Sequence, residues 1–175
     1  MTGILTFISR IDRVLAILIK PIVVVISLAV AVMLTYGIFT RAVLDAPVFG
    51  LEELVLMAAM WLYMLGAVLA SRDRSHLTAD FIEVITDNAR VIKAVHLLAT
   101  SISLFMAVMF AVWSYDLLQW GVQKGQTTPV FQLPWYLSQG SLFVASVLFI
   151  FYLIRDFLSD LTGLHAPNPG VVNQE

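Results

Sequence analysis

The stretch GLEELVLMAAMWLYMLGAVLASRDRSH, residues 50–76, indicates the fold class of the chain. After the adjacent carboxylates Glu52 and Glu53, it carries no charge until Arg72. The apolar run, at about residues 51–70, has close to the roughly 20 residues that a helix needs to cross hydrocarbon. The stretch therefore predicts a transmembrane helix that begins with two neighbouring carboxylates.

Three further apolar runs, at about residues 22–39, 94–115 and 135–154, have the same character. The chain is 60% hydrophobic and 13% charged, more apolar than a soluble domain of 175 residues could bury. Strands would alternate in polarity and would need a closed barrel. We therefore predict an all-α integral membrane protein with four transmembrane helices in one domain, residues 1–160. Residues 161–175, which are rich in proline and glycine, are predicted to form a flexible cytoplasmic tail.

Two amphipathic stretches predict helices that lie on the membrane surface. One is at the N-terminus, where apolar residues repeat at helical spacing between Phe7 and Leu18, and Pro21 would then occupy the first turn of span one. The other is residues 77–92, between spans two and three. Both could be simple connectors, or a scaffold that widens the footprint of the protein in the membrane.

The distribution of basic residues predicts the orientation. Eight of the ten Lys and Arg residues flank the spans on one side: Arg10, Arg13, Lys20, Arg72, Arg74, Arg90, Lys93 and Arg155. The other side has Arg41 and Lys124. The positive-inside rule thus places both termini in the cytoplasm, with span one as an uncleaved signal-anchor.

Composition argues against several functions. The net charge of -2 argues against nucleic acid as a partner, so the expected surroundings are membrane lipid and protein. There is no cysteine, the three histidines lie far apart, and no span has a mid-membrane charge or an internal Pro/Gly break. We therefore predict no enzyme activity, no cofactor and no metal site, and an accessory role within a membrane complex.

Small and aromatic residues in span two have two possible uses. Gly66 and Ala70 are spaced so that another helix backbone could approach closely. Trp61 and Tyr63 lie near mid-span, where their polar groups need partners. These residues serve either packing within this chain or contact with a second membrane protein.

Residues 41–80 resemble the small membrane subunit of TRAP transporters, the tripartite ATP-independent periplasmic systems. The family pattern is matched in order by Arg41, Pro47, Glu52, Glu53, Leu54, Trp61, Gly66, His76 and Asp80. The second outer loop is similar to that of the family through Thr128, Pro129, Pro134 and Trp135. Where the family often has a tryptophan before the acidic pair, this chain has Phe49 and Gly50.

The resemblance implies a function and partners. The partners would be a large TRAP membrane subunit, which carries the substrate and sodium sites and moves as an elevator, and a periplasmic substrate-binding protein. The substrate would be an organic acid of the C4-dicarboxylate or sialic acid type, and the location the bacterial inner membrane. The small subunit would enlarge the static scaffold. The alternative is a membrane anchor of a respiratory or other multi-subunit complex.

The two glutamates predict a contact. Neighbouring helical residues point about 100° apart, so the two carboxylates cannot face the same water. One would face the lipid headgroups and the other would turn toward protein, where Arg41 or a basic group on the large subunit could pair with it. His76 and Asp80, spaced four residues apart, predict a local hydrogen bond or a partner contact.

Overall fold

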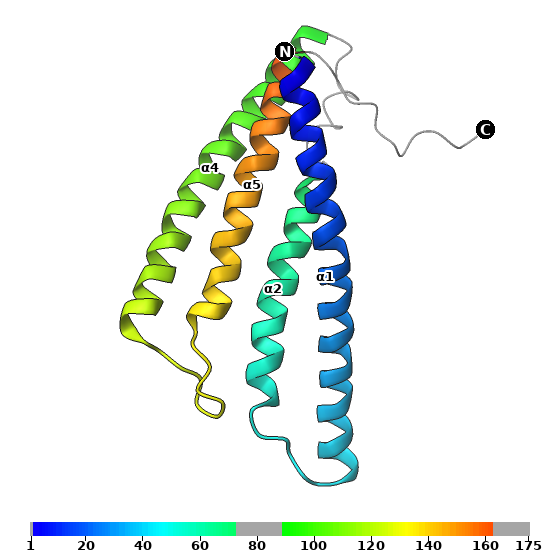
Figure 1. Ribbon diagram of the computed structural model, residues 1–175, viewed down its shortest axis with the longest axis vertical. Helices are drawn as coiled ribbons and strands as arrows, with labels where there is room; N and C mark the ends of the chain where they lie inside the picture. Colours follow the sequence, from blue (N-terminus) through cyan, green and yellow to red (C-terminus); the bar gives the residue numbers. More distant parts are fainter. Residues whose placement is uncertain (1, 73–88, 163–175) are drawn as a thin grey trace, which may run out of the picture.

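The computed structural model describes residues 2–72 and 89–162 of the chain, which form long helices (Figure 1). They are α1 (Thr2–Val43), α2 (Leu51–Arg72), α4 (Ala89–Lys124) and α5 (Tyr136–Thr162). Each contains a segment long and apolar enough to cross a membrane: Ile11–Val43, Leu51–Arg72, Ala94–Lys124 and Tyr136–Leu158. The predicted class, an all-α protein with four membrane-spanning helices, is confirmed.

We had predicted that the N-terminal amphipathic stretch forms a separate surface helix, but it does not. Helix α1 runs unbroken from Thr2 to Val43, and Pro21 lies inside it and not in a first turn. Proline removes one backbone hydrogen bond from a helix, but α1 continues through it; Ala16 and Ile19, just before it, are buried, and Ile19 belongs to the core. At about 1.5 Å per residue, α1 is about 63 Å long, roughly twice the ~30 Å thickness of hydrocarbon.

Two other predictions concern segments that the structure describes in part. Of the predicted surface helix at residues 77–92, residues 89–92 form the start of α4, and the remainder lies outside the described residues. Of the predicted tail, residues 161–162 belong to α5, and residues 163–175 lie outside the described part.

Over most of their length the helices stand side by side in one row, in the order α4, α5, α2, α1, and toward the end that carries the N-terminus α1 also contacts α5 (Figure 1). Each hairpin packs along its own length, and the two hairpins meet where α2 contacts α5. Of the most apolar segment in each helix, 17% is buried in α2 and 28% in α5, against 6% in α1 and 6% in α4. The arrangement is therefore a slab with two broad apolar faces instead of a closed bundle.

The core lies where α1, α2 and α5 meet. Its buried members are Ile19, Leu65, Val68, Ala145 and Tyr152. These side chains join both hairpins into one unit, because they come from three helices that are far apart in sequence.

Small side chains line the contact between α4 and α5. Ser114 and Ser146 are buried, and their hydroxyl oxygens lie 3.3 Å apart. Ala107, two turns before Ser114 in α4, is also buried. Small residues allow two helix backbones to approach closely inside a membrane, which explains why this pair of helices packs so extensively.

Candidate functional site

The loop end of the molecule, which we define as residues 44–50 and 125–135, contains Pro47, Thr128, Pro129 and Pro134, and the helix ends beside it carry Arg41, Glu52 and Glu53. Helix α1 ends there: the N–H groups of Leu44 and Ala46 donate to the carbonyl of Thr40 at 3.1 and 3.2 Å. Asp45 has a φ of 46°, so the chain reverses direction through a left-handed residue, a common way to end a helix. Arg41 lies in the last turn of α1, where the helix dipole favours a cation.

The loop between α4 and α5 is held by its own hydrogen bonds. Thr127 and Pro134 form an isolated antiparallel bridge. The N–H of Thr128 donates to the carbonyl of Leu133 at 2.9 Å, and the N–H of Leu133 donates to the Thr128 hydroxyl at 3.0 Å. Thr128 is buried in this loop. These bonds give residues 127–134 a defined shape, with Pro129 at the turn.

Glu53 connects this loop to the start of α2. Its carboxylate accepts hydrogen bonds from the backbone N–H of Val130 at 2.8 Å and of Phe131 at 3.0 Å. The Thr128 hydroxyl also bonds to it. Charge-assisted hydrogen bonds of this kind are among the stronger ones in proteins. Glu53 therefore joins the two hairpins at the loop end.

Gly50, just before α2, also lies against the loop between α4 and α5. The ring of Phe131 lies so close to Gly50 that a Cβ atom there would overlap it. Gly50 also has a φ of 83°, a conformation that glycine adopts without a steric penalty. A side chain at position 50 would therefore meet both the unfavourable φ and the Phe131 ring of the loop packed over it.

Glu52 has a different environment from Glu53. It is exposed and lines a groove of about 430 Å³ between α1 and α2, together with Arg41 and Pro47. In the described part of the chain, no ion pair joins Arg41 to either glutamate. One glutamate, Glu53, turns toward protein, but its partner is the second loop of the same chain and not Arg41.

The opposite end of the molecule carries an ion cluster that the sequence analysis missed. The Asp12 carboxylate in α1 contacts Arg72 Nε at 2.7 Å and Arg155 Nη1 at 3.3 Å. Arg155 Nη2 contacts Asp156 Oδ1 at 2.9 Å and donates to the carbonyl of Arg72 at 3.0 Å. The four side chains, which we call the arginine cluster, are 11–20% exposed, and their formal charges cancel.

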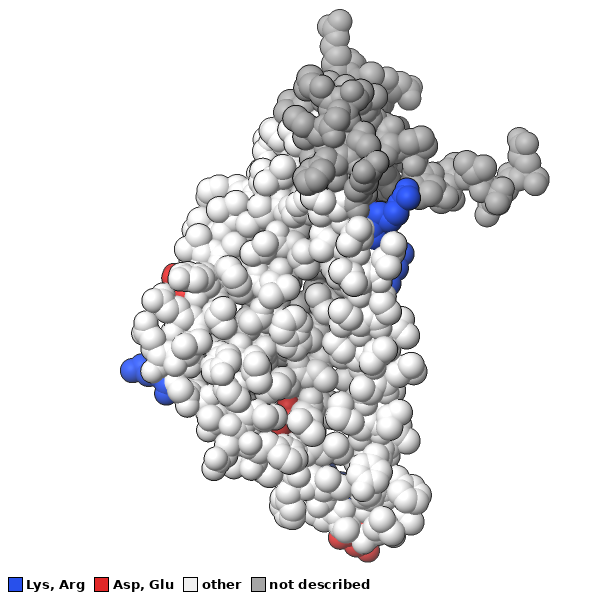
Figure 2. Space-filling model, viewed as in Figure 1, with Lys and Arg blue, Asp and Glu red and all other residues white. Residues whose placement is uncertain are grey.

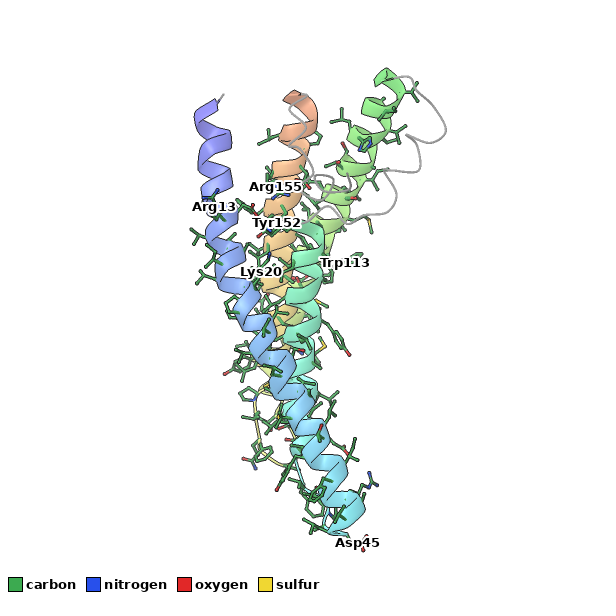
Figure 3. The ribbon with its side chains drawn as sticks, turned by 90° about the vertical axis from the view of Figure 1, so that its right-hand side faces the viewer. Arg13, Lys20, Asp45, Trp113, Tyr152 and Arg155 are labelled. Carbon is green, nitrogen blue, oxygen red and sulfur yellow. The ribbon has the colours of Figure 1, made fainter. Side chains whose placement is uncertain are left out.

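Tyr152 extends this cluster into the core. The guanidinium carbon of Arg155 lies 5.3 Å from the centre of the Tyr152 ring, in a cation–π contact. Figure 3 shows both residues on α5, toward the end that carries the N-terminus and far from Asp45. Arg72 and Arg155 entered the sequence prediction only as basic residues that set the orientation in the membrane. A partner for them could have been sought in Asp12, a carboxylate in an amphipathic stretch on the same side of the membrane as both arginines.

The predicted packing residues of α2 divide between two roles. Trp61 packs against the core, and its Nε1–H donates to the carbonyl of Leu137 in α5 at 3.1 Å. Tyr63, by contrast, is 68% exposed. No atom lies within 4 Å of the position where a Cβ of Gly66 would stand. Trp61 is therefore used within the chain, whereas Gly66 and Tyr63 lie on an open face of α2.

His76 and Asp80 fall outside the described residues, so their predicted contact stays a prediction. The face shown in Figure 2 is largely uncharged, with few Lys, Arg, Asp or Glu atoms at its surface. Large apolar side chains on α1 and α4 are exposed, among them Val32, Ile38 and Phe105. Such a surface suits hydrocarbon or a second membrane protein.

Comparison with known proteins identifies the relatives of the chain. Residues 29–163, more than half of the sequence, match the family described as "Tripartite ATP-independent periplasmic transporters, DctQ component". No curated protein matches the chain. The family match covers the loops, Glu53 and all of α2, as well as nearly all of the described parts of α4 and α5.

Proposed function

Because the chain belongs to the DctQ family, the small membrane components of tripartite ATP-independent periplasmic transporters, we propose that it is a static scaffold paired with the large membrane subunit. The observation that carries this proposal is the single row of helices. A row leaves both faces of α1 and α4 open, and it can therefore extend the width of a partner within the membrane.

Contacts at both ends of the row support a rigid part and not a moving one. At the loop end, Glu53 links α2 to the loop before α5. At the other end, the arginine cluster links α1, α2 and α5. The core around Tyr152 lies between them. A unit held at three levels resists sliding of one helix past another, which is what a scaffold beside a moving partner needs.

The open face of α2 is our candidate for the contact with the large subunit. Tyr63 and Ala67 are exposed on it, and among the described residues nothing lies within 4 Å of the position that a Cβ of Gly66 would take. Small residues at such a face allow a partner helix to approach closely. His76 and Asp80, which follow α2, Arg41 in the last turn of α1 and Pro47 in the first loop belong to the same proposed set of interface residues.

The family also supports a proposal for the energy source, the substrate and the location of the protein. We propose sodium-driven import of an organic acid of the C4-dicarboxylate or sialic acid type, delivered by a periplasmic binding protein. The proposed location is the bacterial inner membrane with both termini in the cytoplasm, so that the loop end and its residues Thr128, Pro129 and Pro134 face the periplasm. The family match favours this function over a respiratory membrane anchor.

The pairing is tested by co-expressing the chain with the large subunit and measuring recovery of the complex in detergent. Gly66→Leu is expected to lower recovery without lowering the thermal stability of the isolated chain, because leucine favours a helix over glycine and the described residues leave space at this position. Gly140→Leu in α5 is the matched control, since Gly140 is also without neighbours within 4 Å. Full recovery with Gly66→Leu would remove the α2 face from the interface.

Transport is tested in liposomes with a sodium gradient and labelled organic acids. The chain alone is expected to give no uptake above empty vesicles. The chain together with its large subunit and binding protein is expected to accumulate substrate. Uptake by the chain alone would contradict the scaffold role.

A further inference from the structure

The groove between α1 and α2 at the loop end has the features of a lipid site. Its volume is about 430 Å³, within the range of about 300–1,000 Å³ typical of small-molecule sites. One wall comes from α1 between Leu34 and Arg41, and the other from α2 between Leu51 and Leu56. Both walls belong to segments long and apolar enough to cross a membrane, so the open side of the groove would face lipid in a membrane.

Polarity changes along the length of the groove. Toward mid-span the lining is apolar and includes Leu34, Ile38 and Val55. At the loop end the lining includes Arg41, in the last turn of α1, and Glu52, in the first turn of α2. Both charged side chains are exposed, and no ion pair joins them. The groove thus offers one cation and one anion directly above a set of apolar side chains.

A glycine shapes the floor between the two helices. A Cβ atom at Gly37 would lie 2.6 Å from Leu51 Cδ2, so the missing side chain allows Leu51 to pack against the backbone of α1. The first residue of α2 is thereby held beside α1, and Glu52, the next residue, is set at the mouth of the groove. The spacing of the two charges is therefore built into the hairpin.

We propose that this groove binds a zwitterionic aminophospholipid. An acyl chain fits the apolar part, the phosphate meets the Arg41 guanidinium, and the ammonium meets the Glu52 carboxylate. Arginine suits phosphate because its planar guanidinium can donate two hydrogen bonds at once. A phospholipid with a phosphate but no amine satisfies Arg41 and leaves Glu52 unpaired, so the groove selects by headgroup.

Native mass spectrometry of the full chain tests this site with three probes: dioleoyl phosphatidylethanolamine, dioleoyl phosphatidylglycerol and diolein. The wild type is expected to retain one phosphatidylethanolamine about tenfold more strongly than phosphatidylglycerol, which lacks the contact with Glu52, and about a hundredfold more strongly than diolein, which lacks both contacts; each factor of ten is the change expected from one charge-assisted hydrogen bond. Arg41→Gln is expected to lose about tenfold in phosphatidylethanolamine binding. Glu52→Gln is expected to bind phosphatidylethanolamine and phosphatidylglycerol equally.

Filling the groove gives a second test with a matched control. Leu34→Trp reduces the space in the groove, whereas Leu28→Trp makes the same change on α1 at an exposed position outside it. Only Leu34→Trp is expected to lower phosphatidylethanolamine retention. Leu56→Trp, from the other wall, replaces it if Leu34→Trp does not fold, as judged by circular dichroism.

Three results would overturn the proposal. The first is equal retention of all three lipids by the wild type, which indicates unspecific annular lipid. The second is equal loss with Leu34→Trp and Leu28→Trp. The third is a crosslink in the assembled complex. Because the chain has no cysteine, Ile38→Cys provides a single crosslinking position in the groove. Crosslinking of Ile38→Cys to the large subunit in high yield would show that protein, and not lipid, occupies the groove.

Discussion

The carboxylate of Glu53 accepts a hydrogen bond at 3.0 Å from the backbone N–H of Phe131, which lies 78 positions away in the sequence. This contact links the first turn of α2 to the loop before α5. It explains why the second of two adjacent glutamates is needed: Glu52 faces outward beside Arg41, and Glu53 supplies acceptors for a loop whose N–H groups would otherwise lack a protein partner.

Glu53→Gln is expected to destabilise the chain, because an amide has one oxygen to accept bonds and presents N–H donors to the second backbone N–H. Hydrogen exchange at Val130 and Phe131 should accelerate. Glu52→Gln is the control and is expected to change stability by no more than about 0.5 kcal/mol. Unchanged exchange at both loop amides in Glu53→Gln would show that the loop holds its shape without this contact.

Asp12→Asn is expected to lower stability by up to about 3–5 kcal/mol, because it leaves Arg72 and Arg155 without their shared carboxylate in a largely buried place. Thermal unfolding in detergent measures the loss. The matched control is Asp45→Asn, at an exposed turn residue with a left-handed φ that asparagine tolerates.

A double-mutant cycle refines the same prediction. Asp12→Asn combined with Arg72→Gln should cost less than the sum of the two single changes, since residues in contact do not contribute independently. Strict additivity would mean that the Asp12–Arg72 pair contributes nothing of its own to stability.

Gly121→Ala and Gly66→Ala are expected to have different effects, although both glycines lie inside helices. Alanine favours a helix over glycine by about 1 kcal/mol, and Gly66→Ala should show that gain because no atom lies nearby. At Gly121 the new Cβ overlaps the side-chain amide of Gln139, so the gain should be lost. Adding Gln139→Ala to Gly121→Ala should restore part of it. Equal gains at both glycines would show that Gln139 moves aside freely.

Gly50→Ala is expected to be more destabilising than Gly125→Ala. Both positions have a left-handed φ, which costs a side-chain-bearing residue about 1–2 kcal/mol. A Cβ at Gly50 also overlaps the Phe131 ring, whereas Gly125 has open space. The difference in melting temperature between the two variants measures the loop contact, and it should shrink when Phe131→Ala is present in both. A difference that persists without the ring would assign the effect to the backbone alone.

The placement of the four membrane spans could be predicted because it is a local property. Each predicted run lies largely within one of the spanning helices. The run predicted at residues 51–70 begins at the same residue as α2 and ends just before the end of that helix. The start of span one was predicted less well. Pro21 indicated a helix start, but α1 runs through it, and whether a helix continues through a proline depends on its surroundings, which local propensity does not show.

The sequence by itself determined the class of the protein, the number of its spans and the presence of two differently placed carboxylates, because the cost of transferring a segment from water to lipid depends on the residues of that segment alone. The tertiary structure decided which groups meet. It arranged the helices in a row, placed the Glu53 carboxylate next to the N–H groups of Val130 and Phe131, and brought the Asp12 carboxylate into ion pairs with Arg72 and Arg155. Such contacts join helix ends and loops distant in sequence, so they depend on how the helices pack and not on the character of any one segment.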